Sequence, residues 1–251
     1  MERQRLLRLE FGDCRLTAGW WMTALTLAGV LLFGQLGRWQ WHRADEKRAL
    51  TAAYAAGGAD FASMLGTRPT TDLPRYAQVR VHGRYETTHQ FLLDNMSHAG
   101  RAGYQVLTPF RLDDGRLLLV NRGWVPQPGG SRDLLPDLSL PEPGAINIGG
   151  RLDSFPVAAI AAGNAAPGAD AAWPRRTSFP TPAQLDSALG QQVEPRQLLL
   201  GESEPHGYLR DWRGIIIGFG PERHVAYALQ WWGLAALIAF LYLFVNLECR
   251  P

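Results

Sequence analysis

The sequence predicts an α+β membrane protein in which two transmembrane helices flank an antiparallel β-barrel or sandwich-like domain. Three observations predict this fold. Residues 16–37 contain no Asp, Glu, Lys, Arg or His, and the same is true of residues 225–247. Between these two runs the chain is polar, rich in Gly and Pro, and contains short segments in which apolar and polar residues alternate. Such alternation is typical of half-buried strands.

The two uncharged runs are long enough to cross a bilayer. At about 1.5 Å per residue each helix would span roughly 33 Å, against roughly 30 Å for the hydrocarbon core. A buried core helix is the alternative, but such helices seldom run so far without one charge. We therefore predict spans over residues 16–40 and 224–247. Aromatic residues suited to interfacial belts stand near their ends: Trp20, Trp21, Trp39, Trp41, Tyr227, Trp231 and Trp232.

The positions of the arginines indicate how the chain is oriented in the membrane. Short flanks rich in arginine stay in the cytoplasm, whereas a long domain crosses the membrane largely regardless of its charge. Arginines flank each run on the side that faces the chain terminus: Arg3, Arg5, Arg8, Arg15 and Arg250. We expect a multi-pass protein of the cell (inner) membrane, with residues 1–15 and 248–251 cytoplasmic and residues 41–223 periplasmic or otherwise extracytoplasmic. The basic residues within 38–48 favour the opposite orientation.

The two cysteines agree weakly with this orientation. Cys14 and Cys249 lie on the predicted cytoplasmic side, where thiols stay reduced, and residues 41–223 contain no cysteine. The first run is also too long for a cleaved signal peptide and lacks a small-residue cleavage site, so we expect an anchor.

The intervening domain is predicted to be mainly β. Residues 41–56 extend the first helix, and residues 181–189 form a short helix with Thr181 as N-cap. Loops are expected at 126–144 and 158–172, so that residues 126–180 are loop-rich and partly flexible. Strands are expected at residues 77–85, 90–94, 104–112, 116–125, 145–152, 197–200 and 213–220.

Composition and motifs exclude several functions. A net charge of +2 does not indicate the strongly basic surface that nucleic-acid binding requires. The sequence contains no Gly-x-Ser-x-Gly, no P-loop, no paired-Cys metal motif and no Cys-x-x-Cys-His. No acid–base pair is evident, so neither an enzyme nor catalytic residues are predicted, and an enzyme that modifies haem or lipid has no support.

His224 is the ionisable residue with the clearest functional position, at the outer mouth of the second span. On a helix it shares one face with Tyr227 and Trp231, and an ionisable group at a span's rim indicates function. Imidazole is a common axial ligand of haem iron, and this face would accept a flat macrocycle. The alternative is an ordinary interfacial histidine whose ring meets water. The other outer histidines, His82, His89, His98 and His206, we interpret as ordinary surface or structural residues.

A second cluster stands at the outer end of the first span and comprises Arg38, Trp39, Gln40 and His42. Arginines here would pair with headgroup phosphates or with haem propionates. From residue type alone, headgroup pairing is the simpler interpretation.

Six segments, in this order and flanked by the two spans, resemble the Surfeit locus protein 1 family. They are residues 36–43, 81–85, 93–95, 103–110, 119–126 and 224–232, and residues 127–180 match poorly. Members of this family are assembly factors of haem–copper terminal oxidases such as cytochrome c oxidase. The resemblance implies that the chain receives haem a from haem a synthase, holds it transiently at the outer membrane face, and aids its insertion into oxidase subunit I.

The resemblance also assigns residues. It implies His224 as the ligand of the haem iron. From their positions at the two helix mouths we also predict Tyr227, Trp231, Arg38, Trp39 and Gln40 around the macrocycle. His42 would serve as second ligand only if the two helix mouths adjoin. A different class of function is a cofactor-free membrane scaffold that stabilises an assembly intermediate. Its interaction surface would comprise Tyr104, Asn121, Arg122, Gly123 and Trp124. The alternative for this block is a hairpin strand, in which Gly123 permits a close backbone approach and Trp124 packs in the core.

Overall fold

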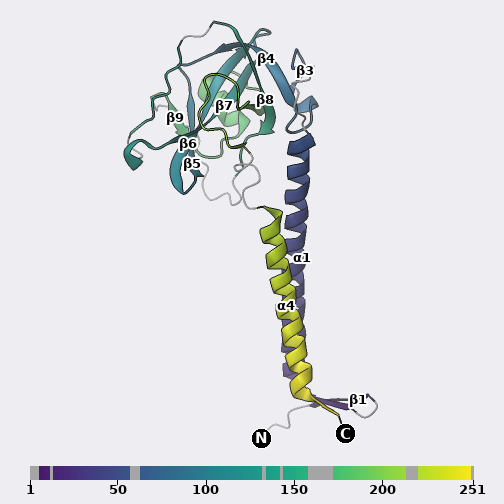
Figure 1. Ribbon diagram of the computed structural model, residues 1–251. Coiled ribbons are helices and arrows are strands. Elements are labelled where there is room, and N and C mark those ends of the chain that lie inside the picture. Colours follow the sequence, from purple (N-terminus) through teal and green to yellow (C-terminus); the bar gives the residue numbers. More distant parts are fainter. Residues whose placement is uncertain are drawn as a thin grey trace. The chain divides into compact units, whose positions relative to one another are not determined.

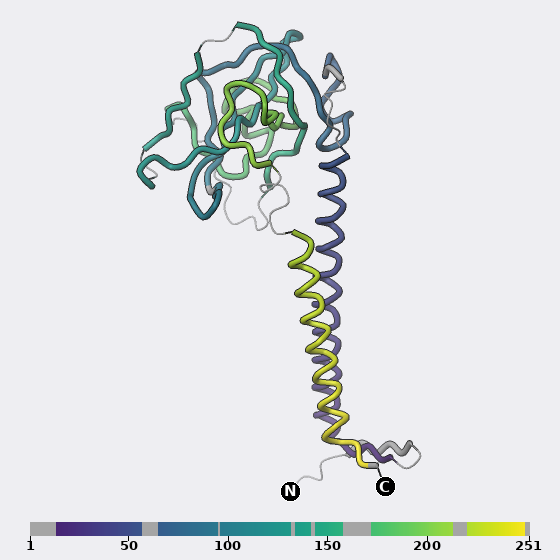
Figure 2. Tube along the Cα trace, viewed as in Figure 1, coloured from purple at the N-terminus to yellow at the C-terminus, as the bar shows by residue number. Residues whose placement is uncertain are grey.

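The computed structural model describes residues 6–11, 14–56, 63–131, 134–141, 144–157, 172–212 and 220–249 (Figures 1 and 2). The chain divides into two compact units. Residues 1–52 and 217–251 form a helical unit, and residues 53–216 form a sheet unit. A β-sheet domain between two apolar helices, as the sequence predicts, is confirmed. The predicted strand at 213–220 falls almost wholly outside the described residues, as does most of the predicted loop at 158–172.

The helical unit consists of two helices that lie side by side (Figure 1), α1 (Trp20–Ala56) and α4 (Pro221–Asn246). The first turn of α1 contacts the last turns of α4, which shows that the two helices run antiparallel. The Thr23 hydroxyl is 2.7 Å from the Tyr242 hydroxyl, and the Phe33 and Trp231 rings stack with centroids 5.5 Å apart. The helices begin four residues later and three residues earlier, respectively, than the predicted spans.

Both helices are long and apolar enough to cross a membrane. Only 6% of the most apolar window of α1 and 11% of that of α4 is buried. The core helix of a soluble domain would be mostly buried. These helices therefore differ from the soluble alternative that their composition left open.

Small residues let the two helices approach closely. A Cβ atom placed on Gly29 would lie 2.8 Å from Cδ1 of Ile238, and one placed on the buried Gly37 would collide with the indole of Trp232. The Trp232 indole N–H donates to the Gly34 carbonyl at 3.3 Å. Small residues at such a contact let two helix backbones approach closely.

A small sheet joins the ends of these helices: β1 (Leu6–Phe11), β2 (Cys14–Gly19) and β11 (Leu247–Cys249), in the order β1-β2-β11. Cys14 is disulfide-bonded, so the expectation of a reduced thiol there is wrong. Antiparallel pairing of β2 with β11 places Cys249 opposite Cys14, a juxtaposition that sequence separation concealed. The cysteines therefore lend no support to the predicted orientation.

The described residues of the sheet unit form eight strands in the order β3-β4-β8-β10-β7-β6-β5-β9, and an additional β4–β6 pairing joins the ends of the series β4-β8-β10-β7-β6. Three pairings are parallel, namely β3–β4, β5–β9 and β7–β10, so the wholly antiparallel expectation is wrong. The strands are β3 (Ser63–Met64), β4 (Gln78–Tyr85), β5 (Phe91–His98), β6 (Arg101–Leu112), β7 (Leu117–Pro126), β8 (Ile146–Ser154), β9 (Arg175–Thr177) and β10 (Arg196–Leu200).

Three short helical segments complete the described part of the sheet unit: η1 (Thr70–Asp72), η2 (Pro128–Gly130) and α2 (Pro182–Leu189). The predicted cap of α2 is confirmed. The Thr181 side chain accepts from the Gln184 N–H while the Gln184 side chain accepts from the Thr181 N–H. This reciprocal pair satisfies two N–H groups that a helix start would leave unpaired.

The core follows from alternation along the strands. On β4, Val79, Val81 and Tyr85 point to one side, where they pack against Leu198 and Leu200 of β10. Intervening residues such as Arg80 and Arg84 are exposed. The same alternation places Gln197 and Leu199 of β10 on the opposite face from Leu198 and Leu200.

Alanine substitution at two glycines of α1 should affect the stability of the helical unit differently. Gly37→Ala should lower the stability of the helical unit by about 1–3 kcal/mol, because the new methyl group must displace the Trp232 indole. Gly34→Ala, where a Cβ would meet no atom within 4 Å, should be neutral or stabilising by up to about 1 kcal/mol. Thermal denaturation of the detergent-solubilised full chain, followed by near-UV circular dichroism, measures both. Equal effects would contradict the packing.

Candidate functional site

The first turn of α4 brings His224 to a partner on α1. Gly220 is the N-cap and Pro221 opens the helix, a position where the missing N–H costs nothing. The Nδ1 atom of His224, which is partly buried, lies 2.8 Å from Oε1 of Gln40. A carbonyl oxygen only accepts hydrogen bonds, so Nδ1 carries the proton. In this tautomer the lone pair of the ring is at Nε2.

This arrangement is the one that metal-binding histidines commonly show. Such a histidine donates its second ring N–H to an oxygen, which selects the tautomer and orients the ring. Gln40 provides that oxygen from the segment that the sequence singled out. The two helix mouths therefore adjoin, which is the condition for a site shared between them.

The other residues predicted around His224 divide into exposed and packed groups. Tyr227 is exposed, whereas Ala228 is fully buried. Trp231 stacks on Phe33 and so belongs to the contact between the helices. Tyr227 is the aromatic side chain of this face that is left open to a ligand.

The structure does not bring His42 to His224. His42 follows Gln40 by two residues, a spacing that places two side chains on opposite sides of a helix. Its Nε2 atom accepts from Nε of Arg38 at 3.4 Å. His224 therefore meets the other helix through Gln40, and the role of His42 as a second ligand stays a prediction.

Charge and aromatic surface surround Gln40. Arg38 and Trp39 are exposed, and the guanidinium of Arg43 lies 6.0 Å from the Trp39 ring centroid. Trp41, the residue after Gln40, has its ring centroid 5.7 Å from that of Trp232. An imidazole with a free lone pair, a nearby guanidinium and open aromatic faces together suit a flat apolar group that carries carboxylates, such as haem.

The predicted interaction block lies inside the sheet unit. Tyr104 on β6 and Asn121, Arg122 and Trp124 on β7 are all buried. Their side chains contact the unit's own residues. That a partner also recognises this block stays a prediction.

Arg122 is a buried cation held by neutral groups. Its guanidinium donates to the His206 carbonyl at 2.7 Å and to Oε1 of Gln90 at 3.1 Å, and it lies 4.7 Å from the Tyr208 ring centroid. Among the described residues no carboxylate contacts it. Burial lowers the pKa of Arg122 from its usual value, because a charge is costly away from water.

Gly123 lets a neighbouring segment lie directly on β7. Its φ of +110° suits only glycine, and a Cβ there would lie 2.6 Å from the Leu209 carbonyl oxygen. Around it the Trp124 N–H donates to the Leu209 carbonyl at 2.7 Å, and the Tyr208 N–H donates to the Arg122 carbonyl at 2.7 Å. The block thus fastens residues 206–209 to the sheet.

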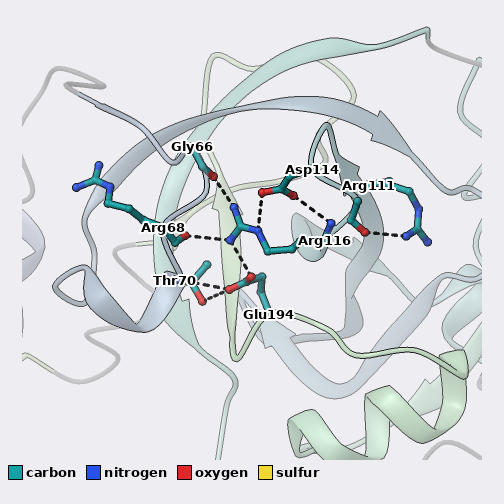
Figure 3. Close-up of polar contacts among 8 residues, drawn as sticks. Gly66, Arg68, Thr70, Arg111, Asp114, Arg116 and Glu194 are labelled. Carbon is teal, nitrogen blue, oxygen red and sulfur yellow. Dashed lines mark hydrogen bonds and ion pairs between the residues drawn. The ribbon is translucent and has the colours of Figure 1, made fainter.

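A polar centre that sequence reasoning missed surrounds Arg116 (Figure 3). Its guanidinium bonds to Asp114 at 2.7 Å, to Glu194 at 2.8 Å and to the carbonyl oxygens of Gly66 and Arg68. Glu194 also accepts from the N–H and hydroxyl of Thr70, at 3.0 and 2.8 Å. Partial burial alone would lower the pKa of Arg116, but the hydrogen bonds to Asp114 and Glu194 raise this pKa above its usual value. This centre joins three loops, and the Asp113-Asp114-Gly115 turn was its only sequence signal.

Comparison with known proteins identifies relatives. A model of the SURF1 family matches residues 27–236. A SURF1-like protein of Monosiga brevicollis is 37% identical over 117 residues, which cover 41% of this chain and 44% of that protein. A SURF1-like protein of Dictyostelium discoideum is 34% identical over 105 residues, which cover 38% of each chain. The chain thus matches less than half the length of either relative.

The hydrogen bond between His224 and Gln40 predicts the histidine tautomer. In the full chain in nanodiscs, ¹⁵N spectra of histidine-labelled protein should show His224 protonated at Nδ1. Gln40→Leu should shift the population towards the Nε2–H form, which usually dominates in water. His224→Ala identifies the signal, and Gln35→Leu, at an exposed position of α1, is the control. An Nε2–H signal in the unmodified chain would contradict the assignment.

The close approach at Gly123 predicts a stability effect. Gly123→Ala should destabilise the sheet unit by about 2–4 kcal/mol, because strain at positive φ adds to a clash with the Leu209 carbonyl. Gly144→Ala, with no atom within 4 Å of the new Cβ, should have little effect. Urea denaturation of the full chain in detergent measures the difference, and equal midpoints would refute the role of this glycine.

Proposed function

Because the chain belongs to the SURF1 family, we propose that it is an assembly factor of a haem–copper terminal oxidase. In this proposal it receives haem a from haem a synthase, holds it at the outer membrane face, and passes it to oxidase subunit I. The observation that carries the proposal is the bond between His224 and Gln40, which leaves Nε2 of the histidine available to iron. Haem a is thus cargo, and the chain itself catalyses nothing.

We propose that α1 and α4 span the membrane, with both termini in the cytoplasm. Large apolar side chains project from them without protein cover: Leu25, Leu31 and Phe244 are 67%, 66% and 74% exposed. In water this surface would be unfavourable by about 25 cal/mol per Å², a cost that lipid removes. Arginine-rich flanks support cytoplasmic termini and a sheet unit on the outer side.

Each residue of the site has a separate task in this proposal. His224 binds the iron through Nε2, and Gln40 keeps the ring in the competent tautomer and orientation. The exposed Arg38 neutralises propionates, while Tyr227 and Trp39 offer aromatic faces to the macrocycle. With one histidine the opposite face of the haem stays open. That openness suits a carrier, because the acceptor's ligand can bind before the carrier's ligand leaves.

The proposal predicts how haem content depends on three residues. When the chain is co-expressed with the haem a synthesis enzymes, His224→Ala should abolish the haem absorption bands of the purified protein. Gln40→Leu should weaken haem binding by about 10- to 100-fold, as loss of a ligand's supporting bond commonly does. His42→Ala, which leaves the His224–Gln40 bond intact, is the matched control and should retain haem.

Two results would overturn the proposal in different ways. Full haem content in the His224→Ala protein would remove this histidine as the ligand. A His224→Ala strain that loses haem yet assembles active oxidase at the normal level would instead show that the chain acts as a cofactor-free scaffold.

A further inference from the structure

A cavity in the sheet unit lies beside a row of buried polar side chains. The row crosses four neighbouring strands, with Gln105 on β6, Asn121 on β7, Gln197 on β10 and Asp153 on β8. The cavity has a volume of about 460 Å³ and is lined by five polar residues, Arg75, Gln105, Asp153, Ser154 and Gln197, together with apolar side chains. Its size lies within the range typical of ligand sites.

The hydrogen bonds within the row determine which atoms face the cavity. The Gly123 N–H donates to Oδ1 of Asn121, so the Asn121 nitrogen must donate. It does so to the side-chain oxygens of Gln105 and Gln197, at 2.9 and 3.1 Å. The Gln197 nitrogen donates in turn to the Ser154 carbonyl. The Gln105 nitrogen has no partner in the described part of the chain and is left to face the cavity as a donor.

Asp153 supplies an acceptor. Its Oδ1 atom accepts from Nε of Arg75 at 2.6 Å and from the Ser154 N–H at 2.8 Å. Its Oδ2 atom has no partner among the residues that the structure describes. Burial raises the pKa of Asp153, although Arg75 opposes the shift. The Gln105 amide nitrogen and Oδ2 of Asp153 are therefore an unused donor and an unused acceptor in the cavity wall.

The remaining walls are apolar and adaptable. Phe155 and Trp212 are buried, Met96 and Phe179 are half-buried, and Val157 at the rim is 85% exposed. Phe179 adopts a φ of +51°, a conformation costly for an aromatic residue. Methionine and aromatic side chains commonly form walls that accept apolar groups of varied shape.

Charge determines what kind of ligand fits. Asp153 already neutralises Arg75, so the site has no net charge to offer. A carboxylate or phosphate would face the Asp153 oxygen, and an ammonium group would face the Arg75 guanidinium. A neutral group with one donor and one acceptor avoids both, and a peptide group is such a group.

We propose that this cavity binds a large apolar side chain together with its peptide group, presented by a segment of a partner polypeptide. The peptide carbonyl accepts from Gln105, the peptide N–H donates to Asp153, and the side chain packs against Phe155, Phe179 and Trp212. The site is separate from the His224 site and does not depend on haem.

The test uses the haem-free full chain in nanodiscs and three probes of one size. They are N-acetylphenylalanine N-methylamide, which is neutral, N-acetylphenylalanine, which is anionic, and phenylalanine N-methylamide, which is cationic. Titration by saturation-transfer NMR should show the neutral probe binding at least about tenfold more tightly than either charged probe. No binding, or equal affinity for all three, would overturn the proposal.

Variants of the chain locate the binding. Asp153→Asn replaces the acceptor oxygen by a donor of the same shape and should lower the affinity for the neutral probe about tenfold. Val157→Asp alters an exposed rim position that folding does not require. It should lower the affinity for the neutral probe severalfold, because it replaces an apolar rim side chain by a charged one. Asp113→Asn, an exposed carboxylate outside this cavity, is the control. Unchanged binding in both the Asp153→Asn and Val157→Asp proteins would place the probe elsewhere and refute the site.

Discussion

The sheet unit depends on two adjacent polar side chains of β7 that are buried on opposite faces. Successive residues of a strand point to opposite sides, so Asn121 and Arg122 each need partners on their own side of the sheet. A buried polar group left unpaired costs about 1–3 kcal/mol, and a buried charge costs more. Asn121 is satisfied by Gln105 and Gln197, while Arg122 is satisfied by Gln90 and the His206 carbonyl.

The two satisfied side chains organise different parts of the unit. Arg122 holds residues 206–209 against β7, where Gly123 provides the space. Asn121 orients two glutamine amides, and in doing so it leaves the Gln105 nitrogen facing the cavity. One buried dipeptide thus determines both a loop attachment and the polarity of a cavity wall.

The helical unit uses the same kind of constraint on a smaller scale. A carbonyl oxygen accepts and never donates, so the contact with Gln40 decides which nitrogen of His224 holds the proton. Close packing at Gly29 and Gly37 brings the two helices near enough for that contact. The chemistry available at the helix mouths therefore depends on small residues within about three turns of Gln40.

Sequence patterns predicted the local features well. The uncharged runs became α1 and α4, the alternating segment at 77–85 became β4, and Thr181 caps α2. Patterns failed where the partner is distant in the chain. β9, the three parallel pairings, the Cys14 disulfide and the Arg116 centre each join segments whose neighbourhood no local periodicity encodes. Whether His42 reaches the second axial position stays a prediction, because no local pattern encodes the relative rotation of two helices.

The sequence by itself determined the family, the two apolar helices and the strand-rich domain, and it singled out His224 and Gln40 as candidates, because hydropathy, periodicity and motif order are properties of the chain alone. Only the tertiary structure decided that Gln40 and not His42 meets His224, that the Asn121–Trp124 block is buried, and that Gln105 and Asp153 border one cavity. Each of these depends on packing between distant segments. Packing selects the partner of a polar side chain, and the partner determines what that side chain does.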